Sequence, residues 1–78
     1  MFYVYIIYSP GSDKYYVGQT NDPDARIRRH NEGYEGFTAP YRPWIKVLVV
    51  VKESRAEAML FERKLKNLSK SRLRAFVV

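Results

Sequence analysis

The chain has 78 residues, no cysteine and one histidine, which excludes disulfides, thiolate zinc sites and all-histidine metal sites. Its 14 lysines and arginines against 8 acidic residues leave a net charge of +6, which favours a polyanionic partner such as nucleic acid. Residues 1–51 carry 6 basic and 5 acidic groups (net +1), whereas residues 52–78 carry 8 and 3 (net +5), so the excess charge lies in the last third.

We expect one cytoplasmic domain that spans residues 1–78 and does not enter a membrane. The length accommodates a single hydrophobic core, and no apolar run reaches the ~20 residues that a membrane helix needs. The apolar start of the chain lacks a basic segment and a small-residue cleavage site, so it does not match a signal peptide. The aromatic side chains, 15% of the residues, supply bulk that a chain without disulfides needs.

The first half predicts a β-hairpin followed by a helix. Residues 2–8 and 15–20 are rich in aromatic and β-branched side chains, and a turn-forming cluster separates these two strands. Asp22 and Pro23 then match the cap and the first position of a helix. That helix should run to about Asn31 and stop at Gly33.

A loop and a third strand follow. Residues 33–43 contain two glycines and two prolines and predict a long loop, which either contacts nucleic acid or only covers the core. Residues 44–51 are apolar at every position except Lys46, and we expect a strand buried on both faces.

The last segment predicts one long helix and a short terminal element. Ser54 and Glu57 form a capping box, in which the Glu57 side chain should reach back to the N–H of Ser54. The helix should run to about Leu68, and residues 69–78 predict a short helix or turn. The element order β-β-α-β-α(-α) predicts an α+β fold, with helices packed on a small sheet.

Glu62 lies beside the apolar stripe of the long helix. The stripe consists of residues at helical spacing, namely Ala58, Phe61, Leu65 and Leu68. One interpretation is a solvated carboxylate that pairs with Lys66 at i+4. The other is a carboxylate held where the helix meets the sheet, in order to bind a cation.

Two further features, on the first helix and in the second strand, are not explained by the packing of apolar side chains alone. Arg26 and His30 share one face of the first helix, which is either a solvated basic face continued by its neighbours or part of a site. Gly18 shares a strand face with Tyr16, and a glycine inside a strand indicates a close backbone approach, a bulge or room for a ligand. A tyrosine hydroxyl beside such a gap could reach a phosphate.

Taken in order, these residues resemble the GIY-YIG nuclease domain. The residues 3–5 (Tyr-Val-Tyr) and 16–18 (Tyr-Val-Gly) are similar to the paired tripeptides of that family, although position 3 is Tyr rather than Gly. Residues 62–66 (Glu-Arg-Lys-Leu-Lys) resemble the late helix of its small stand-alone, single-domain bacterial members, the UPF0213-like group. The resemblance covers almost the whole chain and implies a three-stranded antiparallel sheet flanked by helices.

The resemblance also implies an activity, namely divalent-metal-dependent endonuclease cleavage of phosphodiester bonds with little sequence specificity. Tyr16 resembles the tyrosine that activates the attacking water, and Tyr5 resembles the second tyrosine of the site. Arg26 resembles the arginine that stabilises the phosphoryl charge, and His30 stands where the family often has a His or Tyr near the nucleophile or leaving group. Glu62 resembles the sole protein ligand of Mg²⁺ or Mn²⁺, which commonly keeps several waters and needs only one or two carboxylates.

The expected substrate is DNA, including branched or damaged DNA, with RNA as a second candidate polymer. Basic side chains on the helices are expected to hold phosphates, namely Arg29, Arg63, Lys66, Lys70 and Arg72. Many active members of the family carry an Asn in the last helix, whereas here Asn67 is the only one after Glu62. The alternative is therefore a non-catalytic nucleic-acid-binding module that uses the basic segment 52–78. A third interpretation, an interaction domain with an incidental basic surface, is less consistent with the ordered polar residues.

Overall fold

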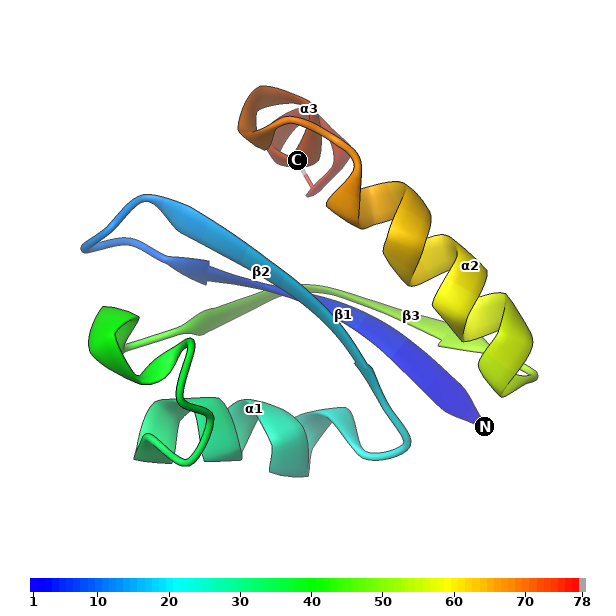
Figure 1. Ribbon diagram of the computed structural model, residues 1–78, viewed down its shortest axis with the longest axis horizontal. Coiled ribbons are helices and arrows are strands. Elements are labelled where there is room, and N and C mark those ends of the chain that lie inside the picture. Colours follow the sequence, from blue (N-terminus) through cyan, green and yellow to red (C-terminus); the bar gives the residue numbers. More distant parts are fainter. Residues whose placement is uncertain (78) are drawn as a thin grey trace.

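The computed structural model describes residues 1–77 and shows a three-stranded antiparallel sheet between two helical layers (Figure 1). The strands β1 (Phe2–Ser9), β2 (Lys14–Thr20) and β3 (Ile45–Lys52) stand in the order β2-β1-β3, with β1 in the centre. The predicted α+β fold is confirmed. Val78, the last residue of the expected terminal element, lies outside the described residues. Within the described range, no helix combines the length and the apolar character needed to cross a membrane.

Helix α1 (Pro23–Glu32) begins and ends at the predicted signals. The Asp22 carboxylate accepts a hydrogen bond from the backbone N–H of Ala25 at 3.2 Å, which satisfies a donor that the first turn leaves open. Gly33 closes the helix in the left-handed conformation, with φ 85°, which a glycine adopts without steric cost.

Helix α2 (Arg55–Lys66) begins with a capping arrangement that differs from the prediction in one contact. Ser54 accepts the N–H of Glu57 at 3.2 Å, as expected. The Glu57 carboxylate, however, accepts the N–H of Glu53 at 3.3 Å rather than that of Ser54. The extended backbone at Ser54 brings the N–H of the preceding residue within reach, so the predicted partner was wrong by one residue.

The end of α2 comes slightly before the predicted position. Lys66 is its last residue, because Asn67 caps the helix and donates its N–H to the carbonyl of Arg63. A short connection leads to α3 (Lys70–Val77), so the terminal element is a helix.

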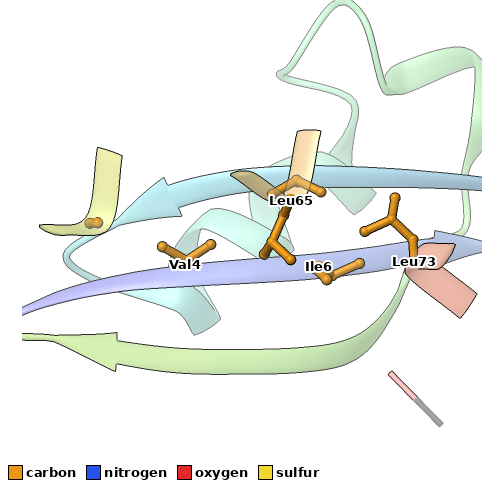
Figure 2. Close-up of a cluster of buried hydrophobic side chains, with 6 residues drawn as sticks. Val4, Ile6, Leu65 and Leu73 are labelled. Carbon is orange, nitrogen blue, oxygen red and sulfur yellow. The ribbon is translucent and has the colours of Figure 1, made fainter. Parts of the chain in front are cut away.

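The side of the sheet that faces α2 and α3 holds the larger apolar cluster. Val4 and Ile6 of β1 point to this side and are fully buried against Leu65 of α2 and Leu73 of α3 (Figure 2). The predicted helical stripe is confirmed, since Ala58 and Leu65 are buried and Phe61 and Leu68 pack against the same cluster. Figure 1 shows α2 and α3 together on this side.

The opposite side of the sheet faces α1 and holds an aromatic cluster. Strand alternation points Tyr5 and Ile7 to this side, where they are buried together with Trp44, and Ile27 of α1 packs against them. Figure 1 shows α1 on this side, together with the loop that leads from it to β3. The two faces of β1 therefore belong to two separate clusters, as the alternation in the sequence predicts.

The prediction that residues 44–51 form a strand buried on both faces was wrong. Strand β3 is an edge strand, and none of its residues is fully buried. Ile45 is 51% exposed and Val51 is 50% exposed. The apolar run indicates a strand correctly, but the number of covered faces depends on the order of the strands, which a local pattern does not contain.

The loop of residues 33–43 is fixed by polar contacts at its end. It contains one 3-10 turn, η1 (Ala39–Tyr41). The Asn31 side chain donates to the Trp44 carbonyl at 3.0 Å and accepts the Trp44 N–H at 2.6 Å. The indole N–H of Trp44 donates to the Thr38 carbonyl at 2.9 Å. This segment is therefore anchored to α1 and to the start of β3.

Candidate active site

Gly18 and Tyr5 stand opposite one another in the β1–β2 register. A Cβ atom added to Gly18 would lie 2.6 Å from Cζ of Tyr5, closer than real side chains approach. The Tyr5 side chain is 1% exposed and occupies this space. Of the three interpretations of a glycine in this strand, the structure supports close approach, and the group that approaches is the tyrosine ring.

The hydroxyl of Tyr5 enters a buried chain of hydrogen bonds through His30. Tyr5 Oη lies 2.8 Å from His30 Nε2, and His30 Nδ1 lies 2.7 Å from Thr38 Oγ1. The Thr38 hydroxyl donates to the Glu35 carbonyl at 3.3 Å, so it accepts from His30 Nδ1–H. His30 Nε2 then accepts the hydrogen bond that the Tyr5 hydroxyl donates. His30 is 1% exposed, so the solvated basic face does not include it.

Electrostatics keep this pair uncharged. Burial raises the pKa of the Tyr5 hydroxyl, and Tyr16 raises it further, while the Arg26 guanidinium close to the hydroxyl lowers it. Burial lowers the pKa of His30, and the Glu35 carboxylate opposes this shift. Both groups are therefore neutral near pH 7, and both are shielded from solvent.

Tyr16 lies at the outer side of the same aromatic cluster and is only half-buried. Its ring centroid lies 5.0 Å from that of His30 and 6.4 Å from that of Tyr5. It also lies 6.1 Å from Phe37 and 6.5 Å from Trp44. The structure therefore brings Tyr5, Tyr16 and His30 together, with Tyr16 as the tyrosine that solvent reaches.

A polar cavity of about 290 Å³ lies beside the N-terminal part of α1. Its lining combines two guanidinium groups, two amides, one hydroxyl and one aromatic ring. These side chains belong to Arg26, Arg55, Gln19, Asn21, Thr20 and Phe2. A guanidinium group donates in a planar fork that matches phosphate oxygens, and two of them favour a dianionic or diester phosphate. The cavity is a candidate phosphate site, and it extends to Arg26, whose charge also acts on Tyr5.

Glu62 lies in the other helical layer, above the end of β2. Its Oε1 accepts from the Gln19 amide at 3.1 Å, and its Oε2 lies 3.2 Å from the Lys66 ammonium. The side chain is 17% exposed, so the predicted pair with Lys66 is present but the carboxylate is not a solvated flank residue. Since Gln19 also lines the cavity of Arg26, it joins the carboxylate to that cavity.

The residues around Glu62 fit a single hard divalent cation. Among residues 1–77, no three His, Cys, Asp or Glu side chains converge on one point. A cation that is bound mainly by water and phosphate oxygens needs only one or two carboxylates. The Glu62 carboxylate accepts a hydrogen bond from Gln19, which lines the cavity of Arg26, and a cation at Oε2 would have to displace the Lys66 ammonium.

The basic residues expected to hold phosphates fall into two groups. Arg63 and Arg72 are exposed on α2 and α3. The other three take part in ion pairs, Arg29 with Glu35, Lys66 with Glu62 and Lys70 with Asp13.

Sequence reasoning missed Gln19 and Arg55 as site residues. Gln19 follows the strand alternation onto the side that α2 covers, where a polar residue at an inward-facing position is itself a signal. Arg55 stands at the first position of α2 and gives no local signal, because only tertiary packing brings it beside Arg26.

Comparison with known proteins identifies the family and the fold of this chain. The GIY-YIG catalytic domain matches residues 1–75. The structure resembles the solution structure of the UPF0213 protein BH0048 from Bacillus halodurans, with a TM-score of 0.63 and 33% identity over 99% of this chain and 83% of that one. The "Structure-specific endonuclease subunit SLX1" of Scheffersomyces stipitis is 35% identical over 77 residues, which cover 88% of this chain and 23% of that protein. The chain thus spans about a quarter of that relative, and it belongs to the GIY-YIG catalytic domain family.

Proposed function

We propose that this protein is a divalent-metal-dependent phosphodiesterase that cleaves DNA. The observation that carries the proposal is the Gln19 side chain, which joins the Glu62 carboxylate to the cavity lined by Arg26 and Arg55. The carboxylate that we propose as the metal ligand and the cavity that we propose as the phosphate site therefore adjoin one another. Membership of a nuclease family supports the phosphodiesterase class.

In this proposal the scissile phosphate enters the cavity of about 290 Å³, where Arg26 and Arg55 neutralise its charge. A preorganised guanidinium stabilises the negative charge that builds on the phosphoryl oxygens as the bond to the leaving oxygen breaks. Mg²⁺ or Mn²⁺ held by Glu62 supplies Lewis-acid polarisation of the phosphate when it is bound.

Tyr16 and Tyr5 have different roles in this mechanism. Tyr16 activates the attacking water in this proposal, since it is the partly exposed tyrosine of the cluster. Tyr5 is buried and donates to His30, so the Tyr5–His30–Thr38 chain positions the strand and ring that carry Tyr16. Tyr5 and His30 are therefore positioning residues.

The substrate proposed is DNA, with branched forms first. The name of the relative from Scheffersomyces stipitis describes a structure-specific endonuclease subunit, which supports testing junctions and flaps alongside duplex DNA. Damaged DNA and RNA complete the panel.

A second candidate function is a nucleic-acid-binding module without cleavage. The observation that favours it is the Lys66 ammonium, which occupies the side of Glu62 that a cation would need. In this alternative, Arg63 and Arg72 on the exposed helices hold the phosphates.

The experiment that tests the proposal compares wild type with Glu62→Ala and Glu62→Gln. Cleavage is assayed with Mg²⁺ and with Mn²⁺ on duplex, single-stranded, flapped and junction DNA and on RNA. Loss of the ligand should lower the cleavage rate by about a hundredfold or more, because a preorganised charge at the reacting phosphate is a large catalytic term. Binding measured by fluorescence anisotropy in EDTA should change little.

The matched control is Glu53→Ala, which removes an exposed carboxylate close to the start of the same helix. It should cleave as wild type does. Wild type that cuts no substrate with either metal would select the binding module, and cleavage retained by Glu62→Ala would remove Glu62 from the reaction.

A further inference from the structure

A groove of about 470 Å³ runs along the outer edge of β2 and is distinct from the cavity of Arg26. One wall is aromatic and comes from the α1 side of the sheet, with Tyr16, Phe37 and Trp44. The other wall comes from the α2–α3 connection and carries Lys66 and Lys70. Because β2 is an edge strand, no further strand of the described chain covers this side of the sheet.

Phe37 is the feature of this groove that packing does not explain. Its side chain is 73% exposed, although the loop that carries it is anchored through Asn31, Thr38 and Trp44. Its ring centroid lies 6.1 Å from that of Tyr16. A fixed loop therefore holds an aromatic ring in solvent beside the candidate site, where it gains little from burial in the free protein.

The charges that flank this ring are positive. Lys14 lies over the Tyr41 ring at 5.1 Å from its centroid, and Tyr41 in turn contacts Phe37. Lys70 pairs with an exposed carboxylate, so a phosphate competes well for it, whereas the partner of Lys66 is the largely buried Glu62. An aromatic platform beside a row of cations is the combination that binds single-stranded nucleic acid, in which bases stack on rings and phosphates follow the charges.

We propose that this groove binds an unpaired nucleotide, with its base stacked on Phe37 and the adjoining phosphates held by Lys14, Lys66 and Lys70. A base inside a duplex is stacked between its neighbours and has no free face, so the groove selects strands with unpaired segments. The inference rests on the proposed action on nucleic acid and deepens it. Tyr16 lines the groove and belongs to the candidate site, so the groove adjoins that site.

The test is a binding measurement in EDTA, so that no cleavage intervenes. Fluorescence anisotropy is recorded with a labelled oligothymidylate, a blunt duplex of two annealed strands and the same duplex with a single-stranded flap. Phe37→Ala should weaken binding of the oligothymidylate and the flap by roughly fivefold to a hundredfold, the range that loss of one base–aromatic stack produces. Binding of the blunt duplex should stay within about twofold of wild type.

Two variants control for the fold and for the chemistry. Phe37→Tyr keeps a stacking ring and should bind as wild type does. Leu60→Ala removes another exposed apolar side chain, 66% exposed on α2, and should leave all three affinities unchanged. Circular dichroism of every variant verifies that the exposed substitutions leave the fold intact.

The inference and the proposed function can fail separately. Equal weakening of all three ligands by Phe37→Ala, or no weakening of any, overturns the selective groove even if the protein cleaves DNA. Loss of oligothymidylate binding by Phe37→Ala, in a protein that cleaves nothing, supports the groove and removes the nuclease proposal.

Discussion

Gly18 and Tyr5 couple the strand register to the site. Tyr5 sits in the space that any side chain at residue 18 would need, and from there its hydroxyl reaches His30. The absence of a Cβ at one residue therefore sets the position of a ring on the next strand, and through that ring the position of a buried imidazole.

Gly18→Ala should destabilise the fold, although alanine usually favours a strand over glycine. The new Cβ would lie 2.6 Å from Cζ of Tyr5, and such overpacking costs about 1–3 kcal/mol of the free energy of unfolding. Chemical denaturation measures the loss. Tyr5→Phe in the same chain removes the nearest atom and should recover part of the stability, whereas an additive loss would contradict this account.

The sequence predicts that Gly18 marks a close backbone approach, a bulge or room for a ligand, but it does not say which of the three. The choice depends on which residue of β1 stands opposite, and that register follows from the whole sheet. His30 shows the same limit, because its spacing from Arg26 is local but its burial depends on Thr38 and the loop.

At the scale of elements, α3 is attached to the β1–β2 hairpin by one carboxylate. Asp13 accepts hydrogen bonds from Tyr8 at 2.7 Å and from the Lys70 ammonium at 3.0 Å, and it also pairs with Arg74. The Arg74 guanidinium lies over the Tyr8 ring at 5.9 Å. Leu73 adds the apolar part of this contact, so polar and apolar groups together hold the last helix on the hairpin.

Asp13→Asn should loosen α3 while the hairpin stays intact. Residue 13 has φ 52°, a conformation that asparagine also tolerates, so the variant removes the charge and not the turn. Hydrogen exchange of the α3 amides should become faster than in wild type, with the exchange of β1 unchanged. Unchanged exchange in α3 would show that Leu73 and the Arg74–Tyr15 hydrogen bond hold the helix without the carboxylate charge.

The same contact gives a pH dependence with a defined sign. Hydrogen bonds from Tyr8, Lys70 and Arg74 hold the pKa of Asp13 well below its usual range. A carboxyl with a depressed folded pKa contributes stability above its unfolded pKa, near ~3.9, and loses it as pH falls through the folded value. The difference in stability between wild type and Asp13→Asn should therefore be full at neutral pH and shrink in acid, which chemical denaturation across a pH series measures.

Elements defined by local signals could be predicted, and properties set by neighbours could not. Asp22 directly precedes α1 and Gly33 directly follows it, and both are recognisable capping residues. The bounds of this helix therefore follow from the sequence. The burial of β3 depends on its place at the edge of the sheet, and the partner of Glu57 depends on the backbone at Ser54.

At the scale of the whole molecule, charge and chemistry are divided between two regions. Residues 52–78 hold a net charge of +5, whereas residues 1–51 hold +1 together with Tyr16 and Arg26. The proposed site forms where these regions meet, with Gln19 from the first and Glu62 from the second. No local pattern relates residues so far apart, and only the resemblance to a family groups Glu62 with Tyr16 and Arg26 in the sequence.

Binding of nucleic acid should weaken as salt concentration rises, and the exposed arginines should set part of the slope. Removing one phosphate-binding side chain lowers the slope of log affinity against log salt by about 0.9 for duplex DNA. Arg63→Ala and Arg72→Ala should each show this decrease, measured by anisotropy across a salt series. Arg28→Ala on α1 is the matched control, and an equal decrease there would show that the last third has no special role.

Trp44 is the only tryptophan of the chain, and it lines the groove beside Tyr16. The intrinsic tryptophan fluorescence of the protein therefore comes from Trp44 alone and needs no added label. An emission change on mixing with a nucleic acid or a divalent salt would come from the groove and its surroundings, whereas anisotropy responds to binding anywhere on the surface. The native chain thus carries an intrinsic optical reporter, which separates occupancy of the groove from attachment elsewhere on the basic surface.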